Sequence, residues 1–233
     1  MEIAQGHIQA QSIAKQTMEF IRNQIRPGME LAEIRRLCEA EMIRLGADSF
    51  WYYDVGAFCF AGDQTALSVS GRQYQTADRR IQREDLITID LSPQIGGRWG
   101  DYARTIVLQE GKVVRQAADV QNEEWRSGLL TEELLRQELR SFARPEISFH
   151  QLYEHFNRLI EKSGFVNLDF LGNLGHTIVQ NKAERVFIEQ GAELRLGEAG
   201  LFTFEPHIGR PGSVYGYKRE DIYYFDEKGL QQL

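Results

Sequence analysis

Four acidic residues stand at matching places in two similar stretches of the chain, and together they could hold metal ions. The first stretch, residues 85–111, reads DLITIDLSPQIGGRWGDYARTIVLQEG, and the second, residues 200–229, reads GLFTFEPHIGRPGSVYGYKREDIYYFDEKG. Each has an apolar run that ends in an acid, a glycine-rich turn, an aromatic–Gly pair, a further acid and another apolar run. The four acids are Asp90, Asp101, Glu205 and Glu220. Two such hairpins would gather four carboxylates, and a buried cluster of this kind needs a cation.

Side-chain alternation places the first acid of each hairpin on a defined face of its strand. Successive side chains in a strand point to opposite faces. Asp90 therefore shares a face with Thr88, and Glu205 shares one with Thr203, within strands that are otherwise apolar. A buried carboxylate without a partner would bind a proton instead of staying charged.

A histidine and the repetition of the pattern favour metal ions over arginine as the partner of these acids. Arg104 and Arg219 lie close to the acids in sequence and could pair with them. His176, in NLGHTIV, adds a further donor, and the glycines before it let the backbone approach a ligand closely. Carboxylate and imidazole donors suit manganese, iron, cobalt or zinc, and they argue against copper.

The chain repeats one order of elements, which predicts how the hairpins are supported. Hydrophobic periodicity and the Gly and Pro breaks predict two helices and a strand-rich zone, followed by two more helices, a loop and the second hairpin. The expected ranges are helices 7–25 and 30–45, strands 49–106, helices 114–141 and 147–164, and a loop at 172–180. We expect one α+β domain, residues 1–233, built from duplicated helix–helix–strand halves. The aromatic residues 50–53 are expected to form a core strand rather than the wall of a pocket.

The composition is that of an ordinary globular protein, and the net charge argues against one class of partner. The 233 residues are 42% hydrophobic and 26% charged, and the net charge of −7 argues against nucleic acid as a partner. No run is long and apolar enough to span a bilayer, and the first residues lack the apolar segment of a signal peptide. Cys38 and Cys59 match no zinc or disulfide spacing, so we expect buried thiols. These features predict a cytoplasmic protein.

The five candidate metal ligands and their flanking residues resemble a known family. The order Asp, Asp, His, Glu, Glu, within ITIDLSP, GDYART, GH, FTFEP and REDI, is similar to that of the pita-bread metallopeptidases. These include methionine aminopeptidases, Xaa-Pro peptidases and creatinase-like proteins, and the last hairpin is most similar to the Xaa-Pro peptidase branch. The resemblance covers nearly the whole chain. It implies a pita-bread fold around a central site for two divalent metal ions and a short-peptide or other small-molecule substrate, and it is compatible with a homodimer.

The resemblance also implies a role for each of the five residues. Asp90 would bind one metal ion, and Asp101 and Glu220 would bridge both. His176 and Glu205 would bind the other ion. A water or hydroxide between the ions would attack a peptide carbonyl, and Glu205 would help to take its proton.

Two histidines that this family uses for substrate and protons are missing here. Arg72 stands at the first expected position and Ala183 near the second, and the usual GHG is GHT. Arginine stays charged near neutrality and cannot act as a general base, but it could hold an anionic substrate group. His207, two residues after Glu205, could replace a missing histidine.

These departures leave three functions open. The first is a dinuclear metal-dependent hydrolase, of Xaa-Pro peptidase or aminopeptidase type, with an atypical substrate. The second is a different metalloenzyme on the same fold, which carries out another hydrolysis or iron or manganese redox chemistry. The third is a binding protein that retains the site without turnover.

Overall fold

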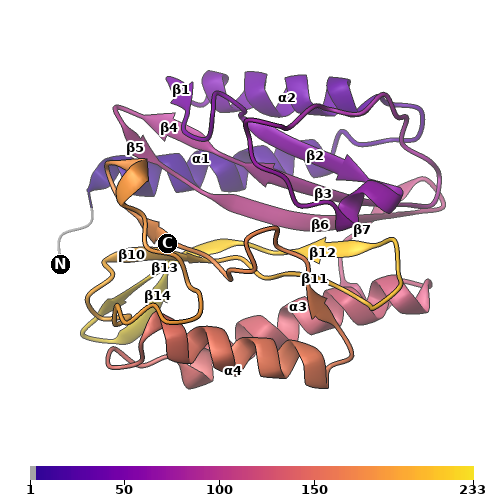
Figure 1. The fold of residues 1–233 in the computed structure, drawn as a ribbon. Helices are drawn as coiled ribbons and strands as arrows, with labels where there is room; N and C mark the ends of the chain where they lie inside the picture. Colours follow the sequence, from indigo (N-terminus) through magenta and orange to yellow (C-terminus); the bar gives the residue numbers. More distant parts are fainter. Residues whose placement is uncertain (1–3) are drawn as a thin grey trace.

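The structure, a computed structural model that describes residues 4–233, consists of two halves with the same order of elements (Figure 1). The helices lie on the outside of the molecule, and the strands of the two halves meet between them. The first half contains α1 (Gln5–Arg22), α2 (Leu31–Arg44), β1 (Ser49–Phe50), β2 (Ala57–Ala61), the 3-10 helix η1 (Gly62–Ala66), β3 (Asp85–Leu91), β4 (Pro93–Ile95), β5 (Arg98–Trp99), β6 (Tyr102–Gln109) and β7 (Lys112–Val114). The second half contains the 3-10 helix η2 (Ala117–Asp119), α3 (Glu123–Phe142), α4 (Phe149–Lys162), β8 (Val166–Asn167), β9 (Thr177–Ile178), the 3-10 helix η3 (Lys182–Glu184), β10 (Leu201–Phe204), β11 (His207–Gly209), β12 (Gly216–Lys218), β13 (Asp221–Asp226) and β14 (Gly229–Gln232). The expected α+β class with duplicated halves is confirmed.

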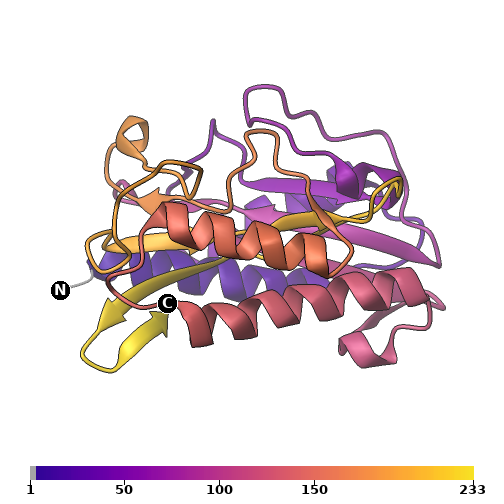
Figure 2. The same ribbon diagram turned by 60° about the horizontal axis from the view of Figure 1, so that its bottom comes forward.

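Each half is built around one four-stranded antiparallel sheet. The strand order is β2-β3-β6-β7 in the first half and β14-β13-β10-β9 in the second. Two three-stranded sheets, β1-β4-β5 and β12-β11-β8, extend them. Helices α3 and α4 lie across the outer side of the second half, as the turned view shows (Figure 2).

Two hydrophobic cores lie between the helices and the strands, and strand β3 contributes to both. Ile87 and Ile89 pack with α1 and α2 in the first core, whereas Leu86, on the other face of the strand, packs with residues of α3 and α4 in the second. Side chains of one strand thus bury their two faces against different halves. This arrangement makes β3 and its neighbours an inner layer, which is where the acids of the first hairpin lie.

The helix expected at residues 114–141 begins later than predicted, at Glu123. Val113 and Val114 are β-branched and pair with β6 instead, at Leu108 and Val107. Asn122 then starts the helix, because its side chain accepts a hydrogen bond from the Trp125 backbone N–H. The other three helices lie within two to three residues of their expected ends.

Two smaller expectations concern the thiols and the membrane. Cys38 and Cys59 are both buried and free, as predicted. Within residues 4–233, none of the helices combines the length and the apolar character needed to cross a bilayer.

Strand register brings the acids of the two hairpins to one face. Asp90 pairs with Ala103 in the β3–β6 ladder, and Ala103 also forms a bridge with Glu220 of the other half. Residues that are paired across strands point to the same face, and so do residues two apart within a strand. Asp101, two residues before Ala103, therefore faces the same way. Because Phe204 pairs with Asp221 in the β10–β13 ladder, Glu205 lies next to Glu220.

Helix α1 holds the backbone of Asp101 from behind. The side-chain amide of Gln11 donates to Asp101 O at 2.9 Å, and its oxygen accepts from Asp101 N at 2.9 Å. Gly100 makes this approach feasible, because a Cβ at that position would lie 2.8 Å from the backbone of Ala10. One helix thus fixes the segment that carries a candidate metal ligand.

We expect the substitution Gln11→Met to destabilise the protein by about 1–3 kcal/mol, because it leaves two buried backbone groups of Asp101 without partners. Urea unfolding measures the loss. Gln16→Met is the matched control, since the Gln16 amide is exposed and bonds only within its own helix. Equal stability of the two variants would contradict the bracing role of Gln11.

Candidate metal centre

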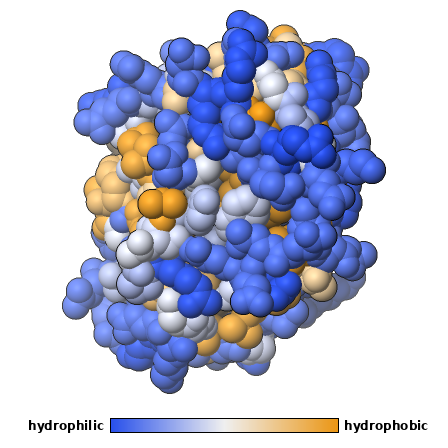
Figure 3. Space-filling model, turned by 90° about the vertical axis from the view of Figure 1, so that its right-hand side faces the viewer, coloured by the Kyte–Doolittle hydropathy of each residue, from blue (hydrophilic) through white to orange (hydrophobic). Residues whose placement is uncertain are grey.

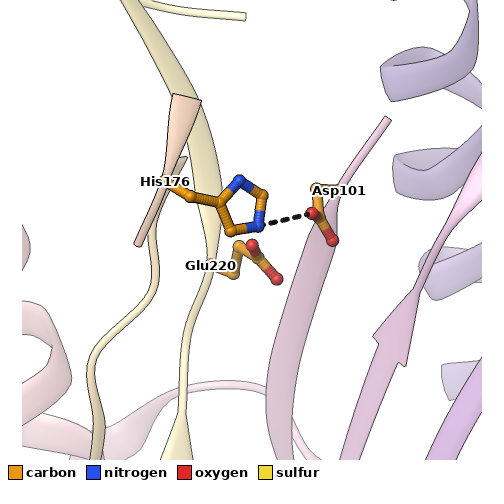
Figure 4. A group of neighbouring side chains, drawn as sticks. All are labelled: Asp101, His176 and Glu220. Atoms are coloured by element: carbon orange, nitrogen blue, oxygen red, sulfur yellow. Dashed lines mark ion pairs between the residues drawn. The ribbon is translucent and has the colours of Figure 1, made fainter. Parts of the chain in front are cut away.

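Three side chains from separate segments point toward one another where the two halves meet (Figure 4). Asp101 precedes β6, His176 precedes β9, and Glu220 precedes β13. One donor atom of each residue lies within 4.8 Å of the donor atoms of the other two. All three residues are nearly inaccessible, with 4%, 5% and 1% exposure respectively. The structure therefore brings together three of the five residues expected to bind metal.

The tautomer of His176 presents a lone pair to the acids. Its Nδ1 lies 3.1 Å from the carbonyl oxygen of Thr177, and since a carbonyl only accepts, Nδ1 carries the proton. Nε2 is then the acceptor, 3.7 Å from Asp101 Oδ2 and 3.6 Å from Glu205 Oε1. Burial, together with the charge of Arg185, lowers the pKa of His176 to about 3, so these contacts are not ion pairs at neutral pH. A bare ring nitrogen that faces carboxylate oxygens, with its other nitrogen bonded to a carbonyl, is typical of a metal-binding histidine.

Glu220 and Asp101 need a positive charge that the surrounding protein supplies only in part. Both carboxylate oxygens of Glu220 are buried and have no hydrogen-bond partner in the part of the chain that the structure describes. Burial and the charge of Asp101 raise the pKa of Glu220 well above its usual range. Burial and the charges of Asp90 and Glu205 do the same to the pKa of Asp101. Buried acceptors without donors, next to a bare imidazole nitrogen, fit a divalent ion.

The remaining two acids are held by a lysine that belongs to the centre. Lys218 Nζ lies 2.6 Å from Asp90 Oδ2, 3.1 Å from Glu205 Oε2 and 4.0 Å from Glu220 Oε2. Although burial lowers it, the attraction of Asp90 and Glu205 raises the pKa of Lys218 well above its usual range. The ammonium therefore stays charged and supplies part of the positive charge that the acids require.

The alternative that Arg104 and Arg219 neutralise these acids is wrong. Arg104 Nη2 donates to Asp221 Oδ1 at 2.6 Å, and Arg219 Nε lies 3.6 Å from Asp221 Oδ2, so both arginines face the acid next to the site instead. The sequence analysis overlooked Lys218, and the alternation of strand side chains could have found it. Lys218 lies two residues before Glu220, so the two share a face.

A cavity of about 320 Å³ opens above these acids, and aromatic side chains form much of its wall. The aromatic residues that line it include Trp51, Tyr52, Tyr53, Phe58, Phe60 and Phe187. The expectation that residues 50–53 form a core strand is wrong for the last three of them, because β1 ends at Phe50 and a turn follows in which Tyr53 has a φ of 56°. Trp51 instead stacks on Trp99 at a ring distance of 4.0 Å, and both rings flank His176.

Exposed apolar side chains stand at the mouth of this cavity. Leu67, Phe170 and Leu171 line it and are 50%, 50% and 57% exposed. A view of one face of the molecule shows apolar side chains gathered beside a paler hollow on an otherwise mostly hydrophilic surface (Figure 3). A cavity with an apolar entrance and charged residues at its floor suits a small ligand that has both an apolar part and a polar or charged part.

His207 lies in the cavity, whereas Arg72 does not. His207 Nε2 is 2.8 Å from the carbonyl oxygen of Thr65, which places the proton on Nε2 and leaves Nδ1 as an acceptor. Burial and the charge of Lys218 lower the pKa of His207 to about 4. Arg72 is exposed and stacks over the Tyr53 ring at 4.9 Å, outside the cavity wall. Since Tyr53 itself lines the cavity, the role of Arg72 toward a substrate stays a prediction.

Arg185 is the arginine that lines the cavity. Its guanidinium carbon lies 5.1 Å from the ring centre of Trp51, 5.7 Å from that of Tyr52 and 5.3 Å from that of Phe187. Arg185 was not among the expected site residues, because the family pattern points only to the position where its members carry a histidine. Ala183, at that position, is exposed in η3.

Comparisons with known proteins agree with this geometry. An Xaa-Pro dipeptidase from Pyrococcus furiosus is 29% identical over 159 residues, which are 67% of this chain and 42% of that protein. The structure of X-Pro aminopeptidase from Thermotoga maritima matches with a TM-score of 0.79 at 22% identity, over 100% of this chain and 62% of that one. Prolidase from Pyrococcus furiosus matches with a TM-score of 0.80 at 24% identity, over 98% and 62%.

The chain thus spans less than two thirds of the length of these relatives. The model of metallopeptidase family M24 matches residues 5–227, nearly the whole chain. The pita-bread fold expected from the sequence is confirmed, as is the likeness to Xaa-Pro peptidases. The chain therefore belongs to metallopeptidase family M24.

Proposed function

We propose that this protein is a metal-dependent peptidase that cleaves short peptides of the Xaa-Pro type. The observation that carries the proposal is the pair of unpartnered carboxylate oxygens of Glu220, which lie with Asp101 and the bare Nε2 of His176 below an aromatic cavity. Family membership and the names of the relatives support the same reaction class.

The five residues expected from the sequence would hold the metal, which we propose to be two divalent ions. Asp101, His176 and Glu220 offer the most compact donor set, and Asp90 and Glu205 lie at its edge, on Lys218. Bound divalent metal would polarise the peptide carbonyl and lower the pKa of a water molecule.

Residues of the chain itself would handle the proton. Glu205 lies 15% exposed at the cavity floor, where a carboxylate oxygen can take a proton from the attacking water. Among residues 4–233, His207 is the one histidine other than His176 that lines the cavity, and its Nδ1 is an acceptor. We propose that His207 orients the substrate or the water through this nitrogen.

The cavity wall supports a substrate with an apolar ring and a free carboxylate. Trp51, Tyr52 and Phe187 offer aromatic faces on which a proline ring could pack. Arg185 lies over the same rings, and a guanidinium binds a carboxylate through two parallel hydrogen bonds. We therefore propose that Arg185, rather than Arg72, binds the anionic group of the substrate.

One observation favours a second candidate, a protein that retains the site without turnover. Lys218 already binds Asp90 and Glu205, so a metal ion at those two acids would have to displace the ammonium or share them with it. A chain that binds metal through the other three residues and cleaves no peptide would match this alternative.

Asp101→Asn should reduce the rate of metal-dependent release of amino acids from a panel of Xaa-Pro dipeptides by at least about 100-fold. The assay is run with manganese, iron, cobalt and zinc in turn. Asp226→Asn, on the exposed end of β13, is the control and should leave the rate unchanged. If the fully metallated protein cleaves no peptide of the panel, the peptidase assignment is wrong.

Lys218→Met should make the metal-free protein less stable by about 3–5 kcal/mol, because it leaves the buried acids without their internal cation. Added metal should restore this loss, and the variant should bind metal more tightly than the original chain. Urea unfolding with and without metal, and calorimetric titration of the metal, measure the two effects. Lys112→Met, at an exposed position of β7, is the control; unchanged metal affinity in the Lys218 variant would show that the ammonium does not compete.

Arg185→Met should raise the KM for dipeptides with a free carboxylate by about 10-fold or more, since it removes a charged hydrogen bond. The KM for the same dipeptides with an amidated end should change little. Arg72→Met is the matched control, because that side chain is exposed and stacked on an aromatic ring but lies outside the cavity wall. A larger effect of Arg72 than of Arg185 would return the anion-binding role to Arg72.

A further inference from the structure

A second cavity, of about 240 Å³, lies between α1, α3 and strand β6 and is separate from the candidate metal centre. Its wall carries four arginines and two glutamates, namely Arg22, Arg104, Arg115, Arg219, Glu132 and Glu133. The two cavities share no lining residue. The lining thus carries more guanidinium groups than carboxyl groups.

Two of the four arginines are hydrogen-bonded to acids, and the buried Nε groups of the other two lack such a bond among residues 4–233. Arg104 is hydrogen-bonded to Asp221, and Arg115 to Glu19. Arg22 Nε and Arg219 Nε are buried and have no hydrogen-bond partner among residues 4–233. The 3.6 Å that separates Arg219 Nε from Asp221 Oδ2 is too long for a hydrogen bond.

The pKa values of Arg22 and Glu132 also indicate an excess of positive charge in this cavity. Burial, followed by the charge of Arg104, lowers the pKa of Arg22 below its usual range, and the attraction of Tyr102 and Glu19 does not offset this effect. Burial also raises the pKa of Glu132 to about 7, so this carboxyl group is only partly ionised near neutrality. The glutamate therefore compensates the arginines incompletely.

The wall of this cavity is tied to the metal centre by hydrogen bonds. Arg104 Nη1 donates to the carbonyl oxygen of Glu220 at 2.7 Å. Thr105 Oγ1 accepts from Lys218 N at 2.8 Å and donates to Glu132 Oε1 at 2.8 Å. Because strand side chains alternate, Arg219 faces away from the centre that Lys218 and Glu220 face.

We propose that this second cavity binds a small oxyanion, a phosphate or carboxylate group, through the guanidinium groups of Arg22 and Arg219, whose buried Nε atoms have no hydrogen-bond partner among residues 4–233. Guanidinium forms paired, charge-assisted hydrogen bonds with both kinds of group. The volume of about 240 Å³ leaves room for the molecule that carries the anionic group. This site is independent of the peptidase assignment, and its occupant would contact the segment that carries Lys218 and Glu220 from the opposite side.

Titration of the purified chain with inorganic phosphate, at constant ionic strength, tests this proposal by calorimetry. We expect saturable binding that Arg22→Gln and Arg219→Gln each weaken by about 10-fold or more. Arg36→Gln, on the exposed side of α2, is the matched control and should bind as the original chain does. Replacing phosphate by succinate tells whether the cavity prefers a phosphate or a carboxylate group.

A further variant separates this site from the metal centre. Binding should persist in Asp101→Asn, because phosphate held by a metal ion would be lost there. Arg22→Lys and Arg219→Lys, which keep the charge, should retain part of the affinity and guard against variants that fail to fold. The proposal is overturned if chloride reproduces the effect of phosphate, if the double variant Arg22→Gln/Arg219→Gln still binds phosphate, or if no saturable binding is found.

Discussion

The repulsion among buried carboxylates is the constraint on which the rest of this structure depends. Two like charges about 4 Å apart cost roughly 4 kcal/mol at the effective dielectric of a protein surface, and more in its interior. Asp101 and Glu220 face each other with little exposure. Such a cluster persists in a folded chain only where cations offset it, and Lys218 lies within 4.0 Å of three of the four acids, Asp90, Glu205 and Glu220.

The architecture around the cluster serves to hold the acids in place against this repulsion. The β3–β6 ladder and the bridge from Ala103 to Glu220 fix the direction of three of them. The two hydrogen bonds from Gln11 hold Asp101. His176 is fixed through its backbone N–H, which donates to Thr203 Oγ1 at 3.0 Å. Each support comes from a different element, so the centre is as rigid as the whole inner layer.

Much of the fold and the centre of the site follow from local pattern. The duplicated hairpins, the acids at strand ends and the helical periodicities are local features, and the two-half α+β architecture follows from them. That Asp101, His176 and Glu220 share a site was expected from the paired hairpins and from the resemblance to the metallopeptidases, whereas strand alternation was applied only to Asp90 and Glu205. The start of α3 was missed because two β-branched residues paired with a strand that lies earlier in the chain, which is a tertiary effect.

The parts that could not be predicted depend on which loop covers the site. Arg72 and Arg185 look alike in sequence, yet only the loop after β9 brings its arginine over the cavity. Lys218 was overlooked for a different reason, since Arg219 stands directly beside Glu220 in the chain and was considered as its partner. The direction of the side chain decides which residue pairs with the acids. Lys218 points toward Asp90, whereas Arg219 points away from the acids, toward Asp221.

The division of the donor set between the halves has a consequence for fragments of this chain. Asp90 and Asp101 come from the first half, and His176, Glu205 and Glu220 come from the second. A cut in the segment between β7 and α3 would leave each fragment with an incomplete set of the proposed ligands. Reassembly of the two fragments would complete this set again. Because divalent metal would bind the assembled pair more tightly than either fragment, it would favour their association.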